Sequence, residues 1–406
     1  MNDTKNMNGL FSKLMISVRS RFGKRDYKTW LFGEWFGNRC CDNSLYFANY
    51  IAENHPGIKL YWAANSGVDT SLLDKRVKVI DRNDESSIDI YKKAGVIIMN
   101  QGIGDFTDVA ADYFSGAITV NLWHGVPWKK ILIDSIDKSK LTEYFIIKGG
   151  FLLTRAKYFL SLSDEFTKVL KTSGGLRTRN IIRAGYPRNS LFYDDQKVSQ
   201  AREKIIELIA EKGGPQSDIN KIIVYMPTFR DSGAETFSFN SMVSDFRDYL
   251  EEKGIVLVEK KHYEDQTEAG SDKSDRILNI PDCNAPELLA AADMLITDYS
   301  SCFFDYLVLD RPVIHYIYDY EYYSKDDRGL YYSKEDVLCG DAPETVDDLV
   351  MYIKENLDDP DKNKILRDKV RDRFLKYEDS KSCERIYRFI VRKIKSVDRY
   401  PKGTVR

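Results

Sequence analysis

The 406-residue sequence lacks the features that mark several classes of protein. No apolar run approaches the roughly 18–20 residues that a membrane-spanning helix needs, and the first residues lack the basic, apolar and small-residue order of a signal peptide. The 11 prolines and 24 glycines show no collagen-like or linker-like excess. The six cysteines form no CxxC pair, which favours reduced thiols in a cytosolic protein over a disulfide framework or a zinc site.

Several motifs of enzyme chemistry are missing as well. The sequence has no GxxxxGK[ST] loop, no HExxH pair and no GxSxG turn, and Gly102-Ile103-Gly104 lacks the third glycine of a dinucleotide fingerprint. We also find no strand-end DxD pair that would hold a metal and a diphosphate. These absences exclude P-loop kinases and zincin proteases, and they predict a protein that needs no metal and no cofactor.

Charge is distributed unevenly along the chain, although the net charge is only −2. Residues 1–30 carry a net charge of +5 and residues 381–406 carry +7, so the segment between them is acidic. Residues 10–25 mix apolar and basic side chains, as in a helix that lies on anionic lipid; a surface helix packed on its own domain fits equally well. Two basic ends predict a local contact with an anionic surface and no nucleic-acid partner.

Short apolar runs alternate with helical patterns through most of the chain. Strands are predicted at 58–63, 77–80, 96–99, 118–122, 158–162, 181–183, 222–225, 255–259, 294–297 and 313–316. Helices are predicted near 195–212, 241–252, 286–292, 301–309, 344–357, 361–377 and 380–394, and Ser163 is expected to cap a further helix. This alternation predicts two α/β domains with parallel sheets.

Polar stretches follow five of the predicted strands, at the position where α/β proteins bind ligands. They lie within Asn121–Lys130, Ile182–Asn189, Tyr225–Asp231, Val258–Tyr263 and Asp298–Asp305. Within the first, the imidazole of His124 suits a general base near neutral pH, and Gly125 lets the backbone approach a ligand. A histidine that is hydrogen-bonded to backbone is an equally good interpretation of His124.

The other four stretches carry groups that bind phosphate. Arg188 offers a planar guanidinium, Lys260 and His262 offer positive charge, and Pro227-Thr228 and Ser300-Ser301 offer a loop and a helix N-terminus. Solvated turn residues and ordinary helix caps would have the same composition. Tyrosines between Tyr316 and Tyr332 either stack on a nucleobase or pack a loop.

Together these motifs resemble the CDP-glycerol glycerophosphotransferase family of teichoic acid and capsule polymer enzymes. The resemblance spans about residues 90 to 375 and is carried by WHG-P, GYPRN, PTFRD, KxH, the long block ITDYSSCFFDYLVLDRPVIHY at 296–316, and RGLYY at 328–332. Three positions depart from the family pattern: Val126 replaces a common threonine, Tyr263 replaces a proline, and Ser333 stands where an acid is usual.

The resemblance implies a GT-B fold, with two Rossmann-like domains whose parallel sheets face a central cleft. It implies a basic N-terminal segment at 1–30, an acceptor domain at 31–190, a CDP-alcohol donor domain at 191–375, and a C-terminal helix and basic tail at 376–406 that pack back on the first domain. The protein would be cytoplasmic and peripheral at the inner face of the cell membrane, in contact with anionic lipid.

The implied reaction moves glycerol phosphate, or a related polyol phosphate, from CDP-glycerol to a hydroxyl of a lipid-linked saccharide or polymer and releases CMP. His124 and His262 would be catalytic. The substrate-binding residues would be Gly125, Arg188, Pro227, Thr228, Lys260, Glu287, Ser300, Ser301 and Asp305. Two alternatives stay open, namely a GT-B glycosyltransferase that uses a nucleotide sugar and a non-catalytic nucleotide-binding subunit of an envelope-polymer complex.

Overall fold

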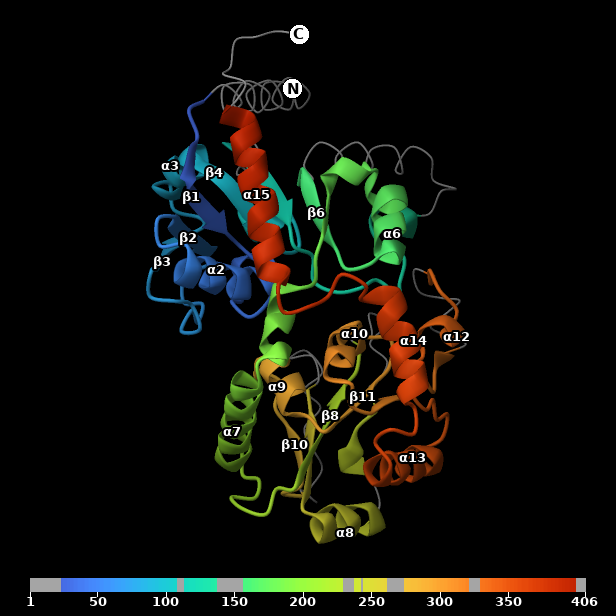
Figure 1. Cartoon of the computed structure of the whole chain (residues 1–406). Helices are drawn as coiled ribbons and strands as arrows, with labels where there is room; N and C mark the ends of the chain where they lie inside the picture. Colours follow the sequence, from blue (N-terminus) through green and yellow to red (C-terminus); the bar gives the residue numbers. More distant parts are fainter. Residues whose placement is uncertain are drawn as a thin grey trace, which may run out of the picture. The chain divides into compact units, whose positions relative to one another are not determined.

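The computed structural model describes residues 23–107, 113–136, 156–228, 237–241, 244–260, 274–320 and 329–398 (Figure 1). The chain divides into two units, and it passes from one to the other four times. Unit 1 comprises residues 1–124, 136–190 and 377–406, and unit 2 comprises residues 125–135 and 191–376. Each unit contains one sheet in which all strands are parallel, so the predicted α/β class is confirmed.

Unit 1 is built on seven strands in the order β3-β2-β1-β4-β5-β6-β7. The strands are β1 (Asp26–Phe32), β2 (Lys59–Ala64), β3 (Val77–Asp81), β4 (Ala94–Met99), β5 (Ile118–Asn121), β6 (Tyr158–Ser161) and β7 (Ile181–Arg183). The helices are α2 (Asn43–Asn54), α3 (Ser87–Lys93), α6 (Asp164–Gly174) and α15 (Ser382–Asp398). All six residues of β4 are buried, as expected of a parallel sheet covered on both faces.

Strand β1 corrects the sequence interpretation, which placed residues 1–30 in a separate basic segment. β1 pairs with both β2 and β4, and Trp30 and Phe32 are fully buried. Asp26 and Lys28 at its exposed beginning conceal the strand pattern, because only its second half is apolar. The amphipathic stretch 10–25 lies almost entirely outside the described residues, so its membrane contact stays a prediction.

Helix α15 belongs to unit 1 although it follows unit 2 in the sequence (Figure 1). The Tyr387 ring stacks on His55 with centroids 3.6 Å apart, and the Phe389 ring meets the Tyr158 ring at 5.1 Å. Ile386 and Ile390, one helical turn apart, are fully buried. The apolar face of α15 therefore packs against α2 and the sheet of unit 1.

Unit 2 is built on five strands in the order β10-β9-β8-β11-β12. The strands are β8 (Lys221–Met226), β9 (Ile255–Glu259), β10 (Ile277–Asn279), β11 (Met294–Thr297) and β12 (Val313–His315). The helices are α7 (Asp195–Glu211), α8 (Ser244–Lys253), α9 (Ala285–Ala291), α10 (Cys302–Tyr306), α12 (Lys334–Val337), α13 (Val346–Asp358) and α14 (Lys364–Phe374). The sequence did not predict β10, and the helix expected at 301–309 is the short α10 followed by a 3-10 turn.

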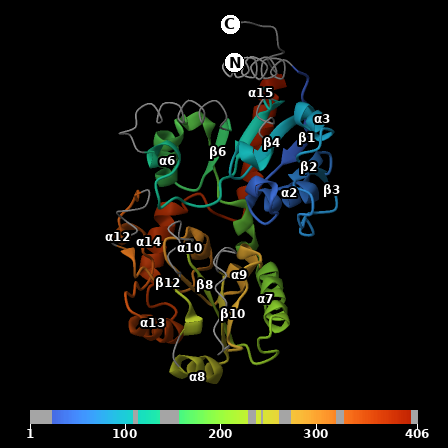
Figure 2. The same cartoon turned by 180° about the vertical axis from the view of Figure 1, so that it is seen from behind.

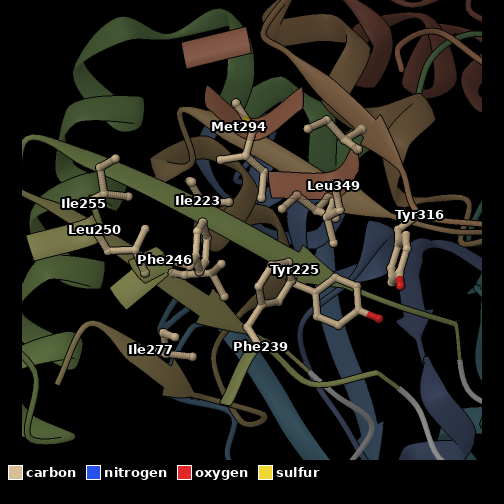
Figure 3. Packing of buried hydrophobic residues seen from close by; sticks show 14 residues of the cluster. Ile223, Tyr225, Phe239, Phe246, Leu250, Ile255, Ile277, Met294, Tyr316 and Leu349 are labelled. Carbon is tan, nitrogen blue, oxygen red and sulfur yellow. The ribbon is translucent and has the colours of Figure 1, made fainter. Parts of the chain in front are cut away.

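One face of the unit 2 sheet packs on α8 and α13 (Figure 3). Ile223 and Tyr225 alternate along β8 and face Phe246 of α8 and Leu349 of α13. Helices α7 and α9 lie side by side (Figure 2), and α9 contacts the central strand β8. Burial on both faces leaves the ends of the parallel strands as the places where side chains reach a ligand.

Residues 125–135 pack on unit 2, whereas the sequence placed them in the first domain. The Trp128 indole N–H donates to the Tyr332 carbonyl at 2.9 Å, and its ring lies 5.7 Å from that of Tyr299. The Lys130 amide donates to the Gly329 carbonyl at 2.9 Å. The segment after His124 is thus built into the same unit as the Ser300-Ser301 turn.

Candidate functional site

His124 follows β5 in unit 1, at the carboxyl edge of the sheet. Its ring stacks on the Trp123 ring with centroids 4.7 Å apart and lies 6.4 Å from the Trp35 ring. Its Nδ1 atom is buried and has no hydrogen-bond partner among the described residues. An imidazole nitrogen without a protein partner is suited to exchange a proton with a bound substrate.

The first residues of α2 hold the His124 loop in place. Asp42 Oδ1 accepts a hydrogen bond from Arg188 at 2.5 Å, and a second Arg188 N–H donates to the His124 carbonyl at 3.0 Å. The Asn43 side chain donates to the Trp123 carbonyl at 2.8 Å and accepts from the Arg188 amide at 3.2 Å. The structure therefore brings His124 and Arg188 together, as neighbours in one network.

This network uses two guanidinium N–H groups of Arg188, which is 8% exposed and lies over the Tyr186 ring. The predicted contact of Arg188 with a diphosphate stays a prediction. The positioning residues Asp42 and Asn43 were missed by sequence reasoning. Their only local signal is an Asp-Asn pair at a helix start, which ordinary capping explains equally well.

The turn that carries Arg188 is itself held by the segment before α15. The Glu378 carboxylate accepts from the Tyr186 amide at 2.9 Å and from the Asn189 side chain at 3.0 Å. A Cβ on Gly185 would fall 2.0 Å from the same carboxylate, which explains the glycine there. Glu378 is a third positioning residue, and no local sequence pattern indicates it.

Three aromatic residues, the two whose rings lie near His124 and Phe36 next to Trp35, adopt left-handed backbone conformations, which non-glycine residues rarely do. The φ angles are 47° at Trp35, 55° at Phe36 and 61° at Trp123. Side chains hold each one: Gln101 accepts from the Trp35 amide at 2.6 Å, Asp105 from the Phe36 amide at 3.0 Å and Asn121 from the Trp123 amide at 2.7 Å. Strain that is held in this way is typical of functional sites.

Electrostatics favour a neutral His124 ring. Burial lowers the pKa of His124 below its ordinary value of 6.5, and the Asp42 carboxylate opposes that shift. Burial raises the pKa of Glu34 well above its ordinary value, and the negative charge of Asp42 raises it further. Glu34 accepts from the Asp42 amide at 2.8 Å and so supports the start of α2. A neutral imidazole can accept a proton, which a general base requires.

In unit 2 the strand order reverses between β8 and β11, the position where open α/β sheets bind ligands. Asp298, after β11, accepts from the Thr228 amide at 2.8 Å and the Thr228 hydroxyl at 2.7 Å, after β8. Its Oδ1 also accepts from the amides of Tyr299 at 2.6 Å and Ser300 at 3.3 Å. Asp298, which the sequence did not single out, joins the two predicted phosphate-binding stretches.

Gly125 packs directly against this turn. A Cβ on residue 125 would lie 2.1 Å from the Ser301 hydroxyl oxygen. Ser301 makes no side-chain cap to α10, and the Cys302 amide donates to the Ser300 hydroxyl at 3.5 Å. The structure thus brings Gly125, Thr228, Ser300 and Ser301 together in unit 2.

The remaining predicted residues lie at neighbouring positions of unit 2. Lys260 follows β9 and donates to the Pro281 carbonyl, and Pro227 is half-buried after β8. Asp305 is buried in α10. The Glu287 carboxylate forms an ion pair with Lys204 at 2.7 Å. His262 and Phe229–Asp231 lie outside the described residues, so the predicted role of His262 stays a prediction.

The described part of the chain has neither a cluster of metal ligands nor a helix suited to span a membrane. It contains no group of three or more His, Cys, Asp or Glu side chains arranged to hold a metal ion. None of its helices combines the length and the apolar character that crossing a bilayer requires.

A family model for CDP-Glycerol:Poly(glycerophosphate) glycerophosphotransferase matches residues 15–392, which include both edges described above. The chain belongs to this family. The predicted membership is therefore confirmed.

Curated relatives are similar along most of the chain. The teichoic acid poly(glycerol phosphate) polymerase of Bacillus subtilis is 26% identical over 400 residues, which cover 94% of this chain and 51% of the relative. The teichoic acid glycerol-phosphate transferase of Staphylococcus aureus is 26% identical over 366 residues, which cover 87% of this chain and 90% of the relative. The chain thus spans about half the length of the first relative and most of the second.

Solved structures share the fold. The wall teichoic acid polymerase TagF aligns with a TM-score of 0.76 at 21% identity, covering 95% of this chain and 93% of that one. A putative UDP-N-acetylglucosamine 2-epimerase from Listeria monocytogenes aligns with a TM-score of 0.53 at 13% identity, covering 94% of this chain and 100% of that one. The predicted GT-B-type fold of two Rossmann-like domains is confirmed by the match to TagF.

Proposed function

We propose that this chain transfers glycerol phosphate from CDP-glycerol to a hydroxyl group of a lipid-linked acceptor and releases CMP, in teichoic acid or capsule polymer synthesis. The observation that carries the proposal is the position of His124 in the chain. His124 lies on a strand-end loop of unit 1, and the next residue, Gly125, packs on the Ser301 turn of unit 2. Membership of the CDP-Glycerol:Poly(glycerophosphate) glycerophosphotransferase family supports the choice of donor.

In the proposed reaction the acceptor oxygen attacks the phosphorus that bears glycerol. A new phosphorus–oxygen bond forms, and the bond from this phosphorus to the oxygen bridging to CMP breaks, so CMP leaves with the electron pair. His124 accepts the proton of the attacking hydroxyl. Transfer of this kind depends on positioning and on neutralising charge, which fixed side chains supply.

Unit 2 is assigned the donor. Ser300 and Ser301 would donate hydrogen bonds to the diphosphate, and Thr228, whose amide and hydroxyl both donate to Asp298, would help to orient that turn. Lys260 and His262 would neutralise the charge of the diphosphate, a role that we also assign to Arg188 of unit 1. Asp305 and Glu287 are assigned to the nucleotide, at the ribose, where the ion pair with Lys204 would hold the Glu287 carboxylate in one orientation.

Unit 1 is assigned the acceptor, a lipid-linked saccharide or polymer. The basic stretches at 1–30 and 381–406 support a peripheral position at the inner face of the cell membrane, because anionic lipid attracts each Lys or Arg by about 1 kcal/mol.

A donor panel tests the function. The purified chain is incubated with a lipid-linked acceptor and, in turn, with CDP-glycerol, CDP-ribitol, a CMP-sugar and a UDP-sugar, and released nucleotide is measured. We expect CMP release with CDP-glycerol and transfer of glycerol phosphate to the acceptor. Release from a sugar nucleotide alone would instead identify a glycosyltransferase, and release from none would identify a non-catalytic subunit.

A further inference from the structure

A groove of about 630 Å³ runs along unit 1 between the edge strand β7 and helix α15. Apolar side chains, among them Ile182, Phe389 and Val391, form part of its lining. The charged members of the lining are all basic, and no acidic residue belongs to it. The proposed chemistry at His124 uses none of these residues.

The basic residues of α15 form one row along the groove. Arg385, Arg388, Arg392 and Lys395 are spaced by three, four and three positions, which places them on one face of the helix over about 15 Å. Arg385 is paired with Asp379 at 2.5 Å, and Arg388 is paired with Glu384. Arg392 and Lys395 are exposed and form no ion pair with any described acidic residue.

We propose that this groove binds an anionic phospholipid of a bilayer surface. The lipid phosphate would lie on Arg392 and Lys395, because guanidinium and ammonium groups donate charge-assisted hydrogen bonds to phosphate oxygens. The glycerol and upper acyl carbons would lie on Phe389 and Val391, a contact that inorganic phosphate does not make. This proposal rests on the proposed function, because a lipid-linked acceptor is the reason why a lipid surface is near.

Charge complementarity favours an anionic lipid over two other occupants, the chain's own terminal segments and a second copy of the chain. The termini outside the described residues are basic, since residues 1–22 have four Lys or Arg and one acid, and residues 399–406 have three and none. Either segment would be repelled by the row on α15. A second copy that presented the same face would bring two basic rows together.

The test uses the full chain and sedimentation with phosphatidylcholine vesicles that contain or lack phosphatidylglycerol. We expect Arg392→Glu/Lys395→Glu to weaken binding to the anionic vesicles by at least about tenfold. The matched control is Lys212→Glu/Lys369→Glu, which changes net charge equally at exposed positions of unit 2 and should bind as the wild type does. Equal binding by both double variants would overturn the proposal.

Val391→Asn separates a built groove from general attraction, because it leaves the net charge unchanged. We expect it to weaken binding of a short-chain phosphatidylglycerol, measured by calorimetry, while its melting temperature stays that of the wild type. Wild-type affinity in Val391→Asn, or equal binding of inorganic phosphate, would reject the groove as a lipid site.

Other occupants give different results, and each overturns the proposal. A change in sedimentation coefficient on charge reversal would identify a second copy, and a large fall in melting temperature with unchanged lipid binding would identify the chain's own ends. CMP release with a water-soluble acceptor is measured in parallel. If the wild type releases CMP but does not bind lipid, only the groove proposal is rejected. If the wild type binds lipid but releases no CMP, only the proposed function is rejected.

Discussion

Gly125 and Ser301 lie so close that a Cβ on residue 125 would stand 2.1 Å from the Ser301 hydroxyl oxygen and 2.9 Å from its Cβ. Gly125→Ala should therefore displace the Ser301 turn, at a cost of about 1–3 kcal/mol for overpacking. We expect a lower melting temperature and a higher KM for CDP-glycerol. Gly125→Ala/Ser301→Gly removes the clash and should restore the melting temperature without restoring donor affinity. A Gly125→Ala protein with wild-type stability and KM would show that the contact is unimportant.

His124→Ala should lower the rate of CMP release by about 10²–10⁴-fold, the usual contribution of a general base. Binding of CDP-glycerol should be retained, because Thr228, Ser300 and Ser301 belong to unit 2. Calorimetry measures the binding, and released CMP measures the rate. Transfer near the wild-type rate would remove His124 from the mechanism.

The pH dependence of kcat tests the environment of His124. Burial lowers the pKa of this imidazole below 6.5, so its neutral form dominates at pH 7 and above. We expect kcat to be level above pH 7 and to fall on the acidic side of a pKa below 6.5. Asp42→Asn removes the carboxylate that raises the pKa of His124, and it should move the acidic limb to lower pH. An acidic limb above pH 6.5 in the wild type would contradict this assignment.

Asp298→Asn should weaken donor binding, because Asp298 joins Thr228 to the Ser300 turn. Loss of charge-assisted hydrogen bonds at a buried carboxylate predicts an increase in KM for CDP-glycerol of about tenfold or more, together with lower stability. Ser300→Ala is the matched control, since it removes one phosphate donor and leaves Asp298 in place. It should raise KM while the melting temperature stays close to that of the wild type. An unchanged KM in Asp298→Asn would show that this turn does not contribute to donor binding.

Because of His315, we expect unit 2 to lose stability at acidic pH. The side chain is fully buried in β12, its ring accepts from the Cys339 amide at 3.3 Å, and burial lowers its pKa to about 4. The pKa of His315 in the folded protein lies below its value near 6.5 in the unfolded chain. The contribution of the neutral ring to the free energy of unfolding is therefore complete above pH 6.5 and is lost as pH falls toward 4. Its full size is about 3 kcal/mol.

Urea unfolding between pH 7 and pH 4 measures this loss. His315→Gln keeps an acceptor for the Cys339 amide but does not titrate, so its stability should depend less on pH in this range. Parallel pH profiles for the wild type and the variant would refute the assignment to His315.

The sequence by itself determined the α/β class, most strands and the stretches where polar residues follow them. These features are local, because a strand is marked by a short apolar run and a helix by its cap. Ser163, for example, caps α6 as predicted by accepting from the Phe166 amide at 3.1 Å. Parallel strands place their carboxyl ends at one edge, so the positions of His124 and Ser300 after their strands were predicted from order along the chain alone.

The tertiary structure alone decided which residues hold these groups in place. Asp42 lies 146 positions before Arg188, and Glu378 lies 192 positions after Tyr186, so no local pattern links either pair. The same holds for residues 125–135, whose unit is set by the partners of Trp128 more than 200 positions later. Periodicity records burial, whereas a hydrogen bond between distant segments depends on how the strands are ordered, and a single sequence does not record that order.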